Sequence, residues 1–165
     1  MVVKSSIWPL YESLKFSGLE KFEQESLLRD VRITKIEWTA IDTICSLRFG
    51  FSNGTTTIQL GDRIKLRETF IFPKDIEIKK VAISVRGEQE YLESLTFWDE
   101  NGNELVSIRG ENVKGELKVL ELGKYENING IGANMCAKYV RGLGFYVWKL
   151  GLGVPLPEEE EEVKE

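Results

Sequence analysis

The sequence predicts an all-β fold, a β-prism of three antiparallel units with pseudo-threefold symmetry around one core. The first observation behind this prediction is an apolar-x-Phe triplet that recurs at intervals of 48 residues. Its copies are Leu47-Arg48-Phe49, Leu95-Thr96-Phe97 and Leu143-Gly144-Phe145. An aliphatic residue precedes each triplet by the same spacing, namely Ile44, Leu92 and Val140. Such a repeat indicates sibling units that are too small to bury their apolar faces separately.

The second observation is a shared pattern upstream of each triplet, which predicts a strand entering each unit. Its copies are Ile33-x-x-Ile36-x-Trp38, Ile78-x-x-Val81-x-Ile83 and Ile128-x-x-Ile131-x-Ala133. The third is a tight-turn signal, Asn53-Gly54 and Asn101-Gly102, after the first two triplets. Residues of period two follow each turn and predict another half-buried strand. These patterns are Thr56-x-Ile58-x-Leu60 and Glu104-x-Val106-x-Ile108.

The three units are expected to span residues 31–72, 76–122 and 128–150. The third unit lacks the second hairpin of the other two, so its missing strands must come from elsewhere. We expect the N-terminal segment around residues 13–22 to run back beside the last strand and remove an open sheet edge. Pro9 leaves open the alternative of short helical turns there. The predicted organisation is an N-terminal extension over 1–30, a prism over 31–150 and an acidic tail over 151–165.

Charge and hydropathy exclude several classes of function. The net charge of −5 resides in the tail, because six glutamates and one lysine occupy residues 158–165, and the rest of the chain is balanced. Because the residues outside the tail carry no excess of positive charge, binding to nucleic acid is not expected. No apolar run approaches the roughly 20 residues that span a bilayer. Residues 1–18 do not resemble a signal peptide, so an intracellular location is expected.

The chemistry-bearing residue types do not suggest an enzyme. The chain has no histidine, which removes the usual general base and the common zinc ligand sets. Cys45 and Cys136 form neither a disulfide framework nor a metal motif, and Cys45 is expected to face the core with Leu47 and Phe49. The hairpin-end carboxylates Glu88, Glu90 and Glu93 leave a glycoside hydrolase as a third hypothesis. We predict no cofactor.

In its repeated strand and turn motifs the sequence resembles the jacalin-related lectins. The resemblance covers about residues 30–150 and implies a β-prism of three Greek-key units, with the N-terminal strand completing the last one. Besides the entry strands, it rests on three motifs. They are Leu95-x-Phe97-x-x-x-Asn101-Gly102, Glu126-x-Ile128-x-Gly130-Ile131 and Tyr139-Val140-x-x-Leu143-Gly144-Phe145.

The resemblance also implies a sugar site, held by a carboxylate in a Gly-x-x-x-Asp motif at the start of the last strand. The corresponding positions here are Ala137 and Arg141, and arginine has no acceptor for a sugar hydroxyl. Unit two offers a partial substitute, because Glu93 occupies the position that Cys45 and Arg141 occupy in the other units. Gly87, Tyr91 and Glu93 are therefore the candidate carbohydrate-binding residues. For Glu93 itself the favoured interpretation is a solvated surface glutamate, because charged side chains at loop ends are mostly exposed.

Aromatic residues are expected on an outward face, where they favour contact with a partner protein. The candidate partner-contact residues are Trp98, Tyr146 and Trp148, and the alternative is that residues 1–18 cover this face. The sequence thus predicts a non-catalytic interaction module, an accessory subunit of a protein assembly. The alternative prediction is a carbohydrate-binding lectin that uses the loops near Glu93.

Overall fold

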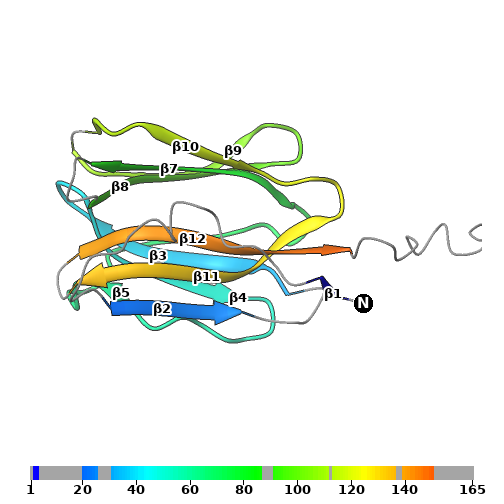
Figure 1. Cartoon of the computed structure of the whole chain (residues 1–165), viewed down its shortest axis with the longest axis horizontal. Coiled ribbons are helices and arrows are strands. Elements are labelled where there is room, and N and C mark those ends of the chain that lie inside the picture. The colour runs from blue at the N-terminus through cyan, green and yellow to red at the C-terminus, as the bar shows by residue number, and fades with distance from the viewer. Residues whose placement is uncertain are drawn as a thin grey trace, which may run out of the picture.

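A computed structural model describes residues 2–3, 20–25, 31–86, 91–111, 113–136 and 139–150. The described residues form three four-stranded antiparallel sheets (Figure 1). The first sheet has the order β5 (Leu60–Gly61), β4 (Ile44–Phe51), β3 (Ile33–Ala40), β6 (Glu68–Ile71). The second has the order β10 (Leu117–Glu121), β7 (Ile78–Arg86), β8 (Tyr91–Asp99), β9 (Glu104–Arg109). The predicted all-β prism is confirmed.

The third sheet joins the two ends of the chain. Its order is β1 (Val2–Val3), β12 (Tyr139–Leu150), β11 (Glu126–Cys136), β2 (Glu20–Glu25). The N-terminal segment therefore completes the third unit, as predicted. The expected pairing was wrong in detail, because β2 pairs with β11, and the segment beside the last strand β12 is β1. Residues 4–19 lie outside the described residues, as does the predicted acidic tail.

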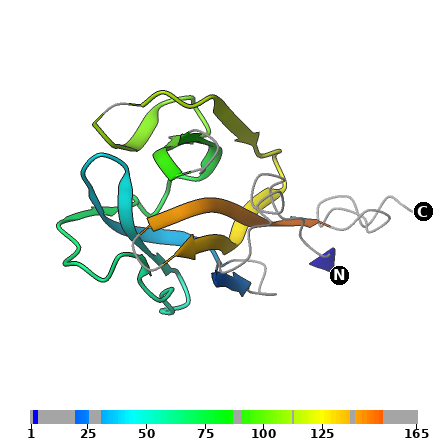
Figure 2. The ribbon, with the colours of Figure 1, turned by 60° about the vertical axis from the view of Figure 1, so that its left-hand side comes forward.

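The three sheets enclose one apolar interior (Figure 2). Phe49, Phe97 and Phe145 are each 0 % exposed, which confirms their predicted inward positions. The rings of Phe97 and Phe145 meet edge to face with centroids 6.2 Å apart, and Phe72 lies 5.5 Å from Phe97. Aromatic rings prefer this geometry over a face-to-face stack.

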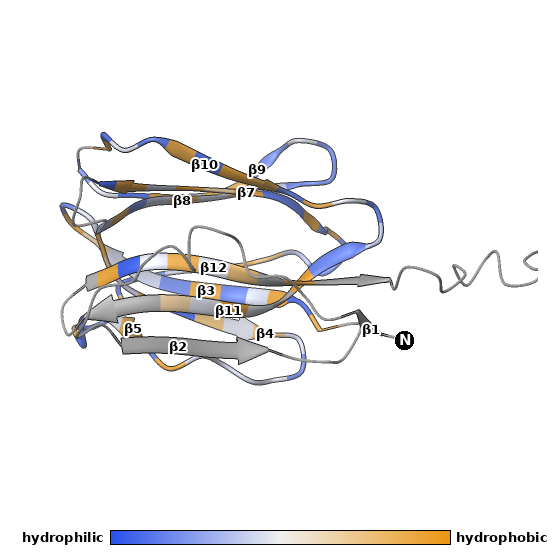
Figure 3. Ribbon diagram, in the orientation of Figure 1, coloured by the Kyte–Doolittle hydropathy of each residue, from blue (hydrophilic) through white to orange (hydrophobic). Residues whose placement is uncertain are grey.

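Hydrophobic and hydrophilic residues follow one another along β3 and β12, as expected for strands with one buried face (Figure 3). Gly54 and Gly102 have φ angles of 88° and 83°, which confirms both predicted tight turns. The strand predicted after the first turn is wrong over most of its length, because β5 covers only Leu60–Gly61 and the Ile58 side chain is 57 % exposed. Thr57 takes the inward place instead, and its hydroxyl accepts a hydrogen bond from the Phe49 N–H at 3.0 Å.

No helix among the described residues is long and apolar enough to cross a membrane.

The shared core predicts that one central phenylalanine stabilises all three sheets. Phe97→Ala removes a fully buried ring and is expected to lower the free energy of unfolding by about 3–5 kcal/mol. Ile71→Ala is the control, because this side chain is 69 % exposed and should change stability by less than about 0.5 kcal/mol. Equal effects in chemical denaturation would contradict the shared core.

Candidate functional site

Strand ends from all three units meet at one end of the prism, and we call it the loop end. Strands β3, β7 and β11 end there, and their antiparallel partners β4, β8 and β12 begin there, on the left in Figure 1. Two longer connections, residues 62–67 and 110–116, reach the same end, because β5 and β9 run antiparallel to β4 and β8. Binding residues commonly lie on such loops when a rigid scaffold positions them.

Each unit carries a β-bulge at the same place at this end. The pairing of β3 with β4 passes from Thr39–Ser46 to Ala40–Ile44, so that one residue of β4 has no direct partner. The pairings of β7 with β8 and of β11 with β12 show the same shift. A bulge re-aims the side chain of the additional residue. These residues are Cys45, Glu93 and Arg141, the three positions that the sequence predicted to be equivalent.

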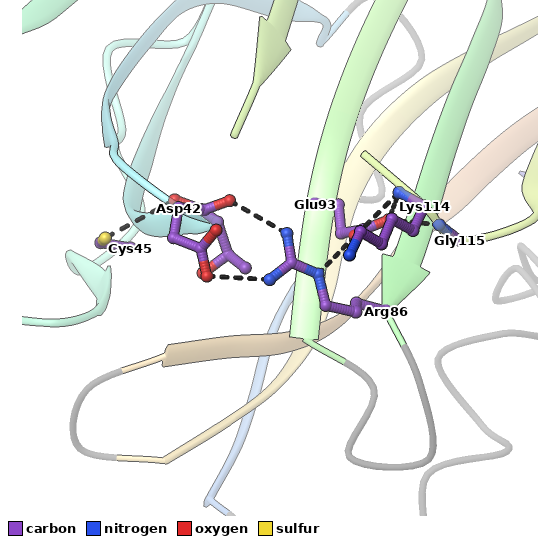
Figure 4. A network of polar contacts seen from close by, with 7 residues as sticks. Asp42, Cys45, Arg86, Glu93, Lys114 and Gly115 are labelled. Atoms are coloured by element: carbon purple, nitrogen blue, oxygen red, sulfur yellow. Dashed lines mark hydrogen bonds and ion pairs between the residues drawn. The ribbon is translucent and has the colours of Figure 1, made fainter. Parts of the chain in front are cut away.

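The Glu93 carboxylate is 0 % exposed and fully bonded, so its interpretation as a solvated surface glutamate was wrong. Arg86 Nε donates to Glu93 Oε2 at 2.6 Å. The backbone N–H of Gly115 donates to Oε1 at 2.6 Å, and that of Lys114 lies 3.0 and 3.1 Å from the two oxygens. Figure 4 shows these contacts. The carboxylate thus holds the 110–116 connection against β7 and β8.

Arg86 links unit two to unit one. Its Nη1 donates to Asp42 Oδ2 at 2.8 Å, and Nη2 lies 3.3 Å from the Asp42 carbonyl oxygen (Figure 4). The backbone N–H of Glu111 also donates to the Asp42 carbonyl at 3.2 Å. A Cβ at Gly110 would lie 2.0 Å from that oxygen, so only glycine permits this approach.

Protonation follows these contacts. Burial would raise the pKa of Glu93, but the hydrogen bonds from Arg86, Gly115 and Lys114 outweigh burial and lower it. The hydrogen bonds to Asp42 and Glu93 raise the pKa of Arg86. Both groups therefore keep their charges at neutral pH.

The bulge residues of the other two units have different surroundings. The Arg141 guanidinium lies over the Tyr91 ring, 5.3 Å from its centroid, and both side chains are half-buried. Cys45 is half-buried instead of inward-facing, because the bulge gives the buried place to Ile44. Burial raises the pKa of its thiol, so Cys45 is a weak nucleophile.

The structure brings together only part of the predicted carbohydrate site. Tyr91 and Glu93 begin β8, but the Glu93 oxygens are occupied by protein donors, which gives this residue a positioning role. Gly87 lies outside the described residues.

The predicted partner-contact residues stay untested. Trp98 is half-buried, and the Lys80 ammonium lies 4.7 Å from its ring centroid. Tyr146 and Trp148 pair through their backbones with β11, and their side chains lie outside the described residues.

Sequence reasoning missed Asp42 and Arg86. Their contact joins residues 44 positions apart, and no local motif marks it. The threefold equivalence of the turns placed both residues at the loop end and could have suggested the pair. The described residues include no cluster of three or more His, Cys, Asp or Glu side chains that could hold a metal ion.

Several lectins of known structure share this fold. Artocarpin complexed with Me-α-mannose matches with a TM-score of 0.67 and 12 % identity, over 90 % of this chain and 99 % of artocarpin. The agglutinin of Calystegia sepium matches with a TM-score of 0.64 and 16 % identity, over 91 % and 100 % of the two chains. Calsepa lectin in complex with a biantennary N-glycan matches with a TM-score of 0.65 and 15 % identity, over 91 % and 100 %. No protein-family model and no curated protein matches the sequence.

The chain therefore has the β-prism fold of the jacalin-related lectins, as the sequence resemblance implied. The predicted role as an accessory subunit of a protein assembly is wrong, because the structures that share the fold over nine tenths of the chain are lectins. The lectin alternative fits these findings better.

The contacts of Glu93 predict a measurable pH dependence. Glu93→Gln is expected to lower the free energy of unfolding at pH 7 by about 2 kcal/mol, because it removes charge-assisted hydrogen bonds in a buried site. The folded pKa of Glu93 lies below its usual 4.5, so its stabilisation is complete above that pH and is lost as the pH falls through the folded pKa.

The wild type should therefore lose stability on acidification below pH 4.5 more steeply than E93Q. Urea unfolding from pH 7 to pH 3 measures this difference. Glu116→Gln is the matched control, because the Glu116 side chain is 82 % exposed. Parallel pH profiles of the wild type and E93Q would rule out the described network.

Proposed function

We propose that this protein is a carbohydrate-binding lectin that holds its glycan at the loop end, near Glu93, without converting it chemically. The shared fold supports the proposal, since the matching structures of artocarpin and Calsepa lectin are complexes with Me-α-mannose and with a biantennary N-glycan. The observation that carries it is a fixed, exposed carboxylate, that of Asp42, among loops from different units.

Asp42 has the exposure and the acceptor capacity that a sugar ligand requires. Its side chain is 62 % exposed, and Oδ2 accepts from Arg86. Oδ1 makes no hydrogen bond with any described residue. A carboxylate oxygen accepts from sugar hydroxyls, and a hydrogen bond to a charged group contributes about 1.5–3 kcal/mol.

The surroundings of Asp42 hold the carboxylate in place before a ligand arrives. The Arg86 guanidinium donates to both the side chain and the carbonyl oxygen of Asp42, and its Nε donates to the buried Glu93 carboxylate. The turn itself is closed by a hydrogen bond from the Ile41 N–H to the Thr43 carbonyl at 3.0 Å. Preorganisation of this kind reduces the entropy that binding would otherwise cost.

Ile41 supplies the complementary apolar surface. Its side chain is 58 % exposed beside Asp42, on the same turn. A sugar ring presents hydroxyls at its edge and C–H groups on its faces, so a carboxylate beside an aliphatic side chain matches both. Protein sites for small ligands generally combine an apolar lining with a few oriented polar groups.

Neutral-glycan binding by the wild type and two single variants tests the proposal. Asp42→Asn should weaken binding about tenfold, because a neutral amide replaces one charged acceptor. A glycan array identifies the ligand, and titration calorimetry measures the change. Asp75→Asn is the control. Asp75 is also exposed but lies at the opposite end of the prism, so this change should leave the glycan affinity unchanged.

Two results would count against this function. One is an array on which the folded wild type gives no signal. The other is glycan binding that D42N leaves intact while circular dichroism shows the same fold.

A further inference from the structure

Three basic side chains form a ridge on the connection from β5 to β6, at the loop end. Arg63, Lys65 and Arg67 occupy alternate positions and are all exposed. Ile64 and Leu66, between them, are half-buried. The segment thus turns its apolar residues inward and its charges outward, and we call the three charged residues the basic ridge.

Hydrogen bonds from well-anchored side chains hold this segment. Gln59 Nε2 donates to the carbonyls of Asp62 and Ile64 at 2.9 and 2.6 Å. The hydroxyl of Thr39, which is 3 % exposed, donates to the Lys65 carbonyl at 2.6 Å and accepts from the Arg67 N–H at 3.0 Å. The backbone that carries the ridge is therefore ordered.

The ridge charges have no counterions within the described part of the chain. Arg63, Lys65 and Arg67 make no ion pair with any described residue, although Asp62 and Glu68 flank them in sequence. Arg48 and Arg86, by contrast, each lie 2.8 Å from a carboxylate oxygen. Like charges on alternate residues of one short segment repel each other, and an anion bound between them relieves that repulsion.

The ridge also borders the proposed sugar site. A Cβ at Gly61 would lie 2.9 Å from Val140 Cγ2, so the connection starts beside the beginning of β12. Arg141 follows Val140 directly and is held over the Tyr91 ring. The backbone N–H of Asp62 donates to the Cys45 carbonyl at 2.9 Å, which ties the connection to the strand that Asp42 precedes.

We propose that the basic ridge binds the oxyanions, sulfate or carboxylate, of an acidic glycan whose sugar ring occupies the site at Asp42. This inference rests on the proposed function and names its ligand class. Arginine pairs with carboxylate or sulfate through two parallel N–H donors, and lysine adds a point charge. The exposed acidic side chains at the same end, Asp42, Glu111 and Glu116, interrupt the positive surface and favour a short ligand over a long polyanion.

The test compares three oligosaccharides of equal length: a sulfated one, an unsulfated polyuronic one and a neutral one. The triple variant Arg63→Gln, Lys65→Gln, Arg67→Gln is measured against the control Arg32→Gln, Lys74→Gln, Lys124→Gln. The control removes the same charge from exposed positions at the opposite end. Calorimetry at low and at physiological salt gives the affinities, and the two acidic ligands show which oxyanion is bound.

We expect the wild type to bind at least one acidic oligosaccharide at least tenfold more tightly than the neutral one. The ridge variant should lose that advantage, and the control should change affinity less than twofold. Neutral-glycan binding should survive in the ridge variant. Raising the salt concentration should weaken acidic-ligand binding by the wild type more than by the ridge variant.

Three results would overturn the inference. They are equal wild-type affinities for acidic and neutral ligands, equal losses in the two triple variants, and tighter wild-type binding to duplex DNA or anionic vesicles than to every oligosaccharide. Neutral-glycan binding alone would leave the proposed function standing and remove only the acidic ligand class.

Discussion

The shared interior is the constraint on which the rest of this protein depends. Each sheet is apolar on one face, and a four-stranded sheet cannot bury that face by itself. Three sheets that meet around Phe49, Phe97 and Phe145 solve the problem together. The third sheet contains β1 and β2 from the start of the chain. Closure of this core therefore pairs the N-terminal strands with the last two strands, β12 and β11.

The closed core fixes the positions of the strand ends. The repeated bulge then determines which side chain is re-aimed at each of these ends. Each unit has a β-bulge at the equivalent position, and the additional residue differs among the units. It is Cys45 in the first, Glu93 in the second and Arg141 in the third. Glu93 binds protein donors and stabilises the loop end, whereas Arg141 lies over an aromatic ring. The backbone symmetry of the three units is thus retained, while the side chains at their bulges differ in chemistry.

Much of the fold could be predicted from the sequence, because the repeat is carried by residues that the common core requires. The inward phenylalanines and the Asn-Gly turns are local signals with a direct physical cause. The bulges were not predictable in this way. Counting by twos from Leu47 and Phe49 placed Cys45 in the core, but a register shift of one residue moves a side chain to the other face.

The site was less accessible to sequence reasoning than the fold. Sequence reasoning considered Glu93 as a sugar-binding carboxylate or as a solvated surface residue, whereas its burial depends on donors 21 and 22 positions away. The Asp42–Arg86 pair joins two different units. Such contacts arise only when the units close around the core, which no local pattern encodes.

Mapping of the glycan contact by heteronuclear NMR tests the central claim most directly. Titration of the isotope-labelled chain with a glycan that it binds should shift backbone amide signals of residues 41–45, 62–67 and 113–116. Signals from the turns at the opposite end, residues 52–56, 73–77 and 100–103, should stay in place. Shifts confined to that opposite end, or spread evenly over both ends, would contradict a binding site built on the loop end of the prism.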